Sequence, residues 1–170
     1  NSQPGDLLIA YAVSSDMIVP QEQDGWTSLY SNTTTATNGS GSGRLLMYKR
    51  RGYETTGNVY VSGGGNCTCV ALRGFLGTID NVKEFVANNT VGTTSFTQNI
   101  NSQQALITLV NQEGGAANAV ISIANTTASF HSEPGYYRSM GIGYNLGSAN
   151  KPISVSLTSD NAYGVYLTVF

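Results

Sequence analysis

Short runs of alternating apolar and polar residues recur along the chain, separated by Gly, Asn, Asp and Ser. Alternation with a period of two is the signature of a β-strand with one buried face. Residues 6–13 are apolar on both faces, so this strand is predicted to be well buried. Other clear strands are predicted at residues 26–30, 44–50, 58–62, 67–75, 105–110, 119–124, 136–144, 153–157 and 163–170, and residues 90–98 are predicted as strand or extended chain.

The run at residues 67–75 also carries small or apolar side chains on both faces. Val70 and Leu72 share one face, and the two cysteines share the other with Ala71. Such a strand is typical of a sheet that is covered on both sides. We therefore predict a central strand here.

Two segments break the strand pattern. Residues 31–43 consist almost entirely of Ser, Thr, Asn and Gly, which cannot bury apolar area, so an exposed loop is predicted. Asp80 can cap a short helical turn over residues 82–86.

The whole pattern predicts an all-β protein of about nine or ten strands with at most one short helix. The length of 170 residues fits one domain. The expected fold is a single β-sandwich domain over residues 1–170, with a jelly-roll-like arrangement.

Composition narrows the function classes. Charged residues make up 11% and hydrophobic residues 40% of the chain, which is not the signature of a disordered protein. The formal net charge is −2, and Lys49-Arg50-Arg51 is the largest basic cluster, so no nucleic-acid partner is expected. No apolar run reaches the roughly 18–20 residues that span a bilayer, and no membrane span is predicted.

The cysteines and the histidine do not form a recognisable reactive site. On an extended strand, Cys67 and Cys69 would have Cα atoms about 6.5–7 Å apart, too far for an easy disulfide, and they are interpreted as two small buried thiols. His131 is the single histidine, so no metal site is predicted. It is interpreted as a loop histidine because no nucleophile elbow accompanies it.

The acidic residues do not predict catalysis either. Glu22 and Asp24 are interpreted as part of an exposed loop rather than a calcium site, which needs six or more oxygen ligands. No two of the ten acids can be paired from the sequence, although two close carboxylates in a cleft would indicate a glycosidase. The chain is therefore expected not to be an enzyme and to need no cofactor.

The aromatic residues are the candidates for ligand contact. Ten tyrosines and one tryptophan are present, and tyrosine suits both protein interfaces and stacking on sugars. Tyr136 and Tyr137 point to opposite faces of one predicted strand, so one of them is a candidate for exposure, as is one of Tyr163 and Tyr166. Packing within the sheet is the alternative. Trp26 is a further candidate for sugar contact, with a core position as its alternative.

Four short motifs occur in order: Pro4-Gly-Asp-Leu-Leu-Ile-Ala10, Gly25-Trp-Thr27, Leu45-Leu-Met-Tyr-Lys49 and Val70-Ala-Leu-Arg-Gly74. In these motifs the chain resembles a β-sandwich domain that recurs in bacteriophage virion proteins and some bacterial surface proteins. The motifs cover about the first half of the chain. The cysteines and Arg50-Arg51 depart from the family pattern.

The resemblance implies a structural component of a phage particle, either a capsid decoration protein or a tail or fibre domain, without catalytic residues. Its expected partners are other virion proteins and further copies of itself, and its expected location is the virion. The competing hypothesis is a carbohydrate-binding module of a secreted or receptor-binding protein, in which Tyr136, Tyr137 and Trp26 would contact a cell-surface glycan.

Overall fold

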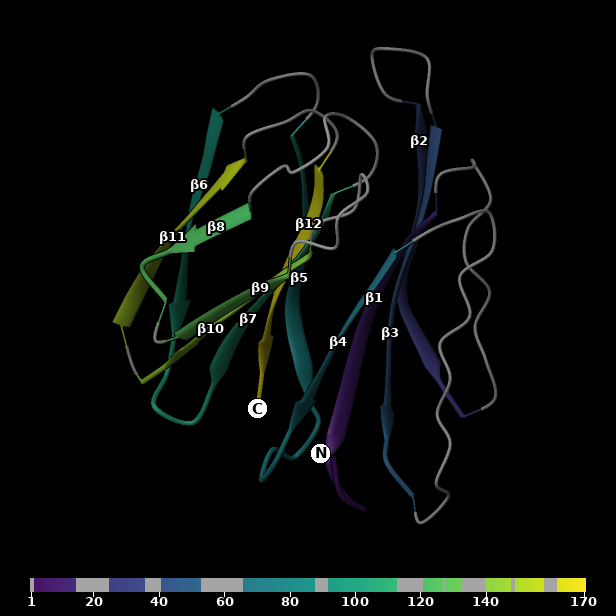
Figure 1. The fold of residues 1–170 in the computed structure, drawn as a ribbon. Coiled ribbons are helices and arrows are strands. Elements are labelled where there is room, and N and C mark those ends of the chain that lie inside the picture. Colours follow the sequence, from purple (N-terminus) through teal and green to yellow (C-terminus); the bar gives the residue numbers. More distant parts are fainter. Residues whose placement is uncertain are drawn as a thin grey trace. The chain divides into compact units, whose positions relative to one another are not determined.

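The computed structural model describes residues 2–14, 25–35, 41–52, 66–87, 92–112, 121–126, 128–132, 140–147, 149–157 and 162–170. These residues form twelve strands and no helix, and all strand pairs are antiparallel (Figure 1). The predicted all-β class is thereby confirmed. The strands are β1 (Leu7–Ser14), β2 (Thr27–Thr35), β3 (Gly41–Arg50), β4 (Asn66–Leu72), β5 (Ile79–Ala87), β6 (Gly92–Ile100), β7 (Ala105–Gln112), β8 (Ile121–Ala124), β9 (Ala128–Ser132), β10 (Met140–Leu146), β11 (Ala149–Leu157) and β12 (Ala162–Val169).

The chain divides into two compact units. The first unit is Asn1–Gly77 and the second is Thr78–Phe170. Each described sheet lies within one unit, and the two units are described separately below. One domain over residues 1–170 stays a prediction.

The first unit is built on one sheet with the order β2-β3-β1-β4. All eight residues of β1 are buried, which confirms the prediction from its two apolar faces. The predicted central position of residues 67–75 is wrong, because β4 pairs with β1 alone and lies at the edge of the described sheet. Small side chains such as Ala71, which is exposed, suit a partly covered edge as well as a core, and this made the pattern ambiguous.

Trp26 anchors the core on one face of this sheet. It clusters with Leu8 and Ala10 of β1 and with Leu45 and Met47 of β3, and Cys67 packs against this cluster. The register explains the cluster, because Ala10 lies opposite Met47 and therefore shares its face.

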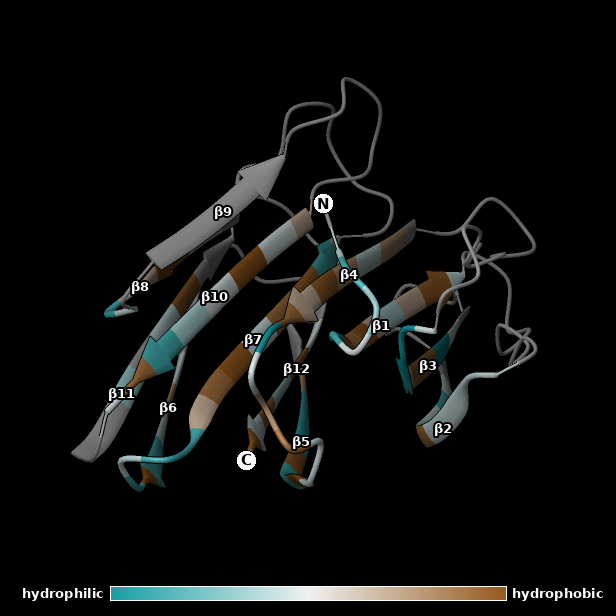
Figure 2. Ribbon diagram, turned by 90° about the horizontal axis from the view of Figure 1, so that it is seen from below, coloured by the Kyte–Doolittle hydropathy of each residue, from teal (hydrophilic) through white to brown (hydrophobic). Residues whose placement is uncertain are grey.

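The second unit layers two sheets. A five-stranded sheet has the order β5-β12-β7-β10-β9, and a three-stranded sheet has the order β6-β11-β8. Their shared core joins Leu106 and Val110 of β7 to Ile100, Ile123 and Val155 of the smaller sheet. Figure 2 shows the hydrophobic stretch along β7 that contributes to this core. The unit is thus a β-sandwich, whereas the jelly-roll arrangement stays a prediction.

Glycine lets the two sheets of the second unit approach closely. A Cβ atom on Gly143 of β10 would lie 2.9 Å from the Cγ2 atoms of both Ile123 and Thr126. Gly143, which lies in the strand predicted at residues 136–144, therefore has a packing role.

Proline is also placed where the sheet tolerates it. Pro152 of β11 pairs with Thr97 of β6, and pairing with β8 begins only at Ser154. In the described sheet β11 has one neighbour at Pro152, so the missing N–H group interrupts no second ladder.

The predicted helical turn over residues 82–86 is wrong. These residues belong to β5, which pairs with β12. The β-branched Val82 and Val86 and the partner strand favour the extended form, and a helix of this length has little stability of its own.

The predicted exposed loop over residues 31–43 is also wrong in part. β2 continues to Thr35, and β3 begins at Gly41. The polar side chains at Ser31, Asn32 and Thr33 are indeed exposed. An edge strand accommodates them because pairing uses the backbone, and threonine favours the strand conformation.

His131 lies in a strand rather than in the predicted loop. It belongs to β9 and lies opposite Gly141 of β10. The run Ala128–Ser132 holds one large apolar residue, Phe130, so its sequence pattern is weak, and pairing with β10 defines it as a strand.

Candidate functional site

The aromatic residues predicted to bind sugar do not come together among the described residues. Tyr136 and Tyr137 lie outside the described residues, as do Glu22 and Asp24. Trp26 is only 4% exposed and its ring packs in the core, the position of a structural side chain. Tyr166 stacks on Phe96 with ring centroids 4.0 Å apart, which supports packing for this residue.

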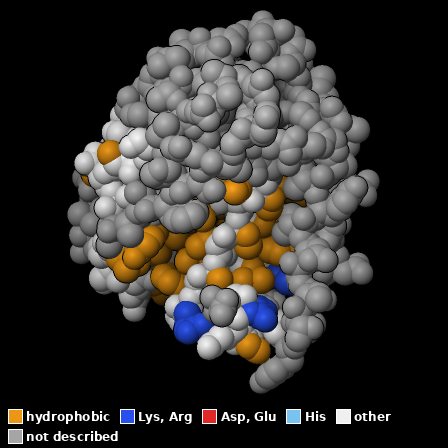
Figure 3. Space-filling view, viewed as in Figure 1, with side chains coloured by type: hydrophobic (Ala, Val, Ile, Leu, Met, Phe, Trp, Pro, Cys, Tyr) orange, Lys and Arg blue, Asp and Glu red, His pale blue; other side chains and the backbone are white. Residues whose placement is uncertain are grey.

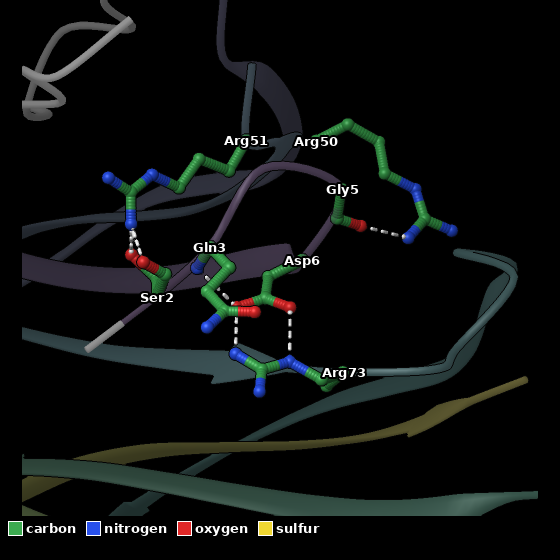
Figure 4. A network of polar contacts seen from close by, with 7 residues as sticks. All are labelled: Ser2, Gln3, Gly5, Asp6, Arg50, Arg51 and Arg73. Carbon is green, nitrogen blue, oxygen red and sulfur yellow. Dashed lines mark hydrogen bonds and ion pairs between the residues drawn. The ribbon is translucent and has the colours of Figure 1, made fainter. Parts of the chain in front are cut away.

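A polar network at the end of the first sheet joins two of the sequence motifs. Asp6 precedes β1 and Arg73 follows β4, and the Arg73 guanidinium donates Nε–H to Oδ1 at 3.1 Å and Nη2–H to Oδ2 at 3.2 Å (Figure 4). The Gln3 backbone N–H donates to Asp6 Oδ2 at 2.6 Å. This bidentate pair fixes the start of the first strand to the end of the last strand of the sheet.

The last residue of β3, Arg50, and the arginine that follows it, Arg51, extend the network in opposite directions (Figure 4). Arg51 donates from Nη1 to the backbone carbonyl and the hydroxyl of Ser2. Arg50 donates from Nη1 to the Gly5 carbonyl at 2.9 Å and from Nη2 to the Phe75 carbonyl at 2.5 Å. Arg50-Arg51 thus has a local structural role, which the family resemblance did not suggest.

The contact with Phe75 shapes a short segment, Arg73–Gly77, that we call the tip. Gly74 and Gly77 have φ angles of +83° and +94°, which favour glycine, and a Cβ atom on Gly77 would lie 2.9 Å from Arg50 Nη2. Between them, Leu76 is 74% exposed, the largest exposure among the large hydrophobic side chains of the described residues. The tip therefore presents a leucine to solvent from a backbone that Arg50 holds in place.

The polar network beside the tip contains more basic than acidic side chains. Arg50, Arg51 and Arg73 face a single acid, Asp6, in this network, whereas the whole chain carries a formal net charge of −2. The Arg73 side chain is 61% exposed and that of Asp6 only 6%. Figure 3 shows Lys and Arg side chains beside hydrophobic ones near the place where Figure 1 marks the N-terminus.

A second exposed apolar surface lies on β10 of the other unit. Tyr144 is 38% and Leu146 is 48% exposed, and both point to the same face of the strand because they are two residues apart. We call these two residues the β10 strip. Tyr144 ended the strand predicted at residues 136–144, but nothing in its sequence context set it apart from the other tyrosines.

The Asp6–Arg73 pair makes the stability of the folded chain depend on pH in the acidic range. The hydrogen bonds from Arg73 and from the Gln3 backbone lower the pKa of Asp6 below its ordinary value of 3.8. Because the carboxylate is favoured in the folded state, its contribution is complete above pH 3.8 and is lost as the pH falls through the lower pKa of the folded chain.

We expect Asp6→Asn to lower stability at pH 6, and the difference from the wild type to shrink toward zero at low pH. Urea unfolding at a series of pH values, followed by the fluorescence of the single tryptophan, measures this. Asp80→Asn, on the exposed Asp80, is the control. A difference that stayed constant from pH 6 to the acid limit would contradict the role of the carboxylate.

The two cysteines are free and belong to β4. The prediction of two buried thiols is wrong for Cys69, which is exposed, and Cys67 is half-buried. The edge position of β4 explains this. Loss of water around the sulfur raises the pKa of Cys67 to about 12 and that of Cys69 to about 11, and the neighbouring thiol adds to the effect at Cys67.

These pKa values predict thiols that react slowly despite the accessible position of Cys69. At pH 8, a pKa of about 11 in place of the ordinary 9.0 reduces the thiolate fraction of Cys69 about 100-fold. A more basic thiolate is a better nucleophile, so alkylation by iodoacetamide should be slower than in the unfolded chain by about tenfold. The rate should rise steeply toward pH 11, with Cys67 the slower thiol. Mass spectrometry of Cys67→Ser and Cys69→Ser variants, with and without urea, measures each thiol separately. Equal rates in the folded and unfolded chains would contradict the raised pKa.

The described parts of the chain offer little other chemistry. They contain no group of three or more His, Cys, Asp or Glu residues that could hold a metal ion. They also contain no helix with the length and hydrophobicity to cross a membrane. What the described site offers is an exposed leucine on a fixed backbone beside arginines, which is suited to contact with another macromolecule.

Comparison with protein-family models, curated proteins and solved structures finds no significant match to this chain.

Proposed function

We propose that this chain is a non-enzymatic structural component of a phage particle, a capsid decoration protein or a tail or fibre domain, which acts through protein–protein contacts. The observation that carries the proposal is Leu76, a 74% exposed leucine at a tip held by the Arg50–Phe75 hydrogen bond. A large apolar side chain on a preorganised backbone loses little conformational entropy on binding, so its burial contributes efficiently to affinity.

The motifs behind the phage resemblance are consistent with this role. Asp6 of the first motif and Arg73 of the last form the ion pair that positions the start of the tip. The motifs therefore contribute to the framework that holds the tip, which carries Leu76. Because this ion pair has a structural role, the shared motifs are better explained by a common fold than by catalysis.

The carbohydrate-binding alternative has less support among the described residues. Of its three candidates, Trp26 is buried in the core. A sugar platform requires an exposed aromatic face, and Tyr144 is the exposed large aromatic side chain in the described residues. A single tyrosine on a strand does not favour sugar over protein as its partner.

Cosedimentation of the purified chain with undecorated phage capsids, beside a glycan-array screen of the same sample, tests the proposal. We expect saturable binding to capsids and a blank array. Glycan binding without capsid binding would replace the proposal with the lectin-like function, and Tyr144→Ala would then be the first variant to examine.

A further inference from the structure

We infer that Cys67 and Cys69 together bind one Cu(I) ion between their two sulfur atoms. This site goes beyond the proposed particle role and does not depend on it. No metal site was expected from the sequence, because the chain offers few of the further ligands that a four-coordinate zinc site needs. A soft ion that accepts two thiolate ligands does not need them.

The two cysteine side chains share one face of β4, because they are two residues apart on the strand. On β1, the neighbouring strand, Ala12 lies opposite Cys67 and Ala10 lies opposite Cys69. Each thiol therefore stands beside a methyl group rather than a large side chain. Cys69 is exposed and Cys67 is half-buried, so an ion can reach the pair from the side of Cys69.

The spacing of the two residues suits a bridging ion better than a disulfide. Neither cysteine is in a disulfide, and Cα atoms about 6.5–7 Å apart on a strand are too far apart for an easy one. In a linear site with metal–sulfur bonds of about 2.3 Å, the length of a Zn–S bond, the sulfurs lie about 4.6 Å apart. Each thiol leans toward the carbonyl oxygen of the next residue, at 3.9 Å for Cys67 and 4.0 Å for Cys69. Rotation of one side chain about χ1 therefore brings the sulfurs closer together while the strand keeps its pairing.

The number of ligands selects the ion. The described residues contain no group of three or more His, Cys, Asp or Glu side chains that could hold a metal. Tetrahedral zinc needs two ligands more than the cysteines supply, and calcium and magnesium need oxygen ligands. Thiolates favour Cu(I). On binding, each thiol loses its proton and forms one Cu–S bond, so one ion releases two protons and the copper stays Cu(I).

Trp26 provides a reporter of the site within the chain. It is the single tryptophan, and Cys67 packs against the core cluster that contains it. An ion held by the Cys67 sulfur therefore lies beside this cluster. We expect its binding to quench the tryptophan fluorescence.

Anaerobic titration of the reduced chain with Cu(I), in competition with a chromogenic Cu(I) chelator, tests the inference. We expect one ion per chain and a fall in tryptophan fluorescence that ends at the same ratio. Cys67→Ser and Cys69→Ser are each expected to weaken binding at least about 100-fold, because loss of a ligand costs more than loss of an outer-shell partner, which costs about 10–100-fold. X-ray absorption of the loaded chain should show two sulfur ligands.

Met47→Leu is the matched control. Met47 lies opposite Ala10 from the other side and carries the sulfur that shares this face of the sheet with Cys69. The substitution keeps the volume of the side chain and removes its sulfur, so the variant should bind Cu(I) like the wild type. Far-UV circular dichroism checks the fold of each variant, and Cys67→Ala and Cys69→Ala replace a serine variant that does not fold.

Four results would overturn the inference. The first is a wild type that retains no Cu(I) against the chelator, and the second is a variant of either cysteine that binds like the wild type. The third is one ion shared by two chains, which sedimentation velocity of the loaded protein would detect. The fourth is weakened binding in Met47→Leu, which would replace the two-sulfur site with one of three ligands.

Discussion

Replacing Trp26 by Ala is expected to lower the free energy of unfolding by about 3–5 kcal/mol, the usual cost of removing a buried aromatic side chain. The indole is 4% exposed and contacts a cluster built from β1 and β3. Lys49 Nζ also lies 5.5 Å from the ring centroid, so the substitution removes a cation–π contact from a buried lysine. The cavity and the lost contact act in the same direction.

Urea unfolding followed by circular dichroism measures this effect, because the variant has no tryptophan left to report by fluorescence. Trp26→Phe is the control and should retain most of the stability, since it keeps an aromatic side chain in the cluster. A Trp26→Ala chain as stable as the wild type would show that the ring is not a core anchor. That result would return Trp26 to the candidates for ligand contact.

Gly164→Ala is expected to lower the free energy of unfolding by about 3 kcal/mol, at the upper end of the range for overpacked sites. A Cβ atom at this position of β12 would lie 2.0 Å from Cζ of Phe85, the residue directly opposite on β5. The ring cannot move freely, because it packs against Phe96 with centroids 5.5 Å apart, and Phe96 stacks on Tyr166. One added methyl group therefore disturbs a row of three aromatic rings.

A double-mutant cycle isolates this clash. In a Phe85→Ala background the ring is absent, so Gly164→Ala should cost far less than it does in the wild type. Equilibrium unfolding of the four chains gives the coupling free energy. Additive effects of the two substitutions would contradict a direct contact between Gly164 and Phe85.

Strand burial was predicted correctly where the strand's own side chains determine it. β1 is apolar on both faces and is buried on both faces. The errors occurred where a neighbour decides the outcome. β5 is a strand because β12 pairs with it, and β4 is an edge because β1 is its one neighbour in the described sheet, and neither partner can be read from the local pattern.

The candidate site shows the same limit. The motifs containing Asp6 and Arg73 stood out in the sequence, but 67 residues separate them, and the ion pair between them follows only from the sheet. Leu76 carried no signal, since a leucine between two glycines is compatible with burial or exposure. The backbone beside it bonds to Arg50, whose partners lie 45 and 25 residues away in the chain.

The order of strands in the larger sheet has a consequence for biosynthesis. Among the described strands, β5 pairs with β12 alone, and β12 lies between β5 and β7 in the sheet. Residues 79–87 therefore have no strand partner in this sheet until residues 162–169 have left the ribosomal exit tunnel. The sheet of the first unit uses strands between Leu7 and Leu72, so it can pair while the second unit is still being translated. Folding on the ribosome is thus expected to proceed in two steps, with the arginine-held tip formed first.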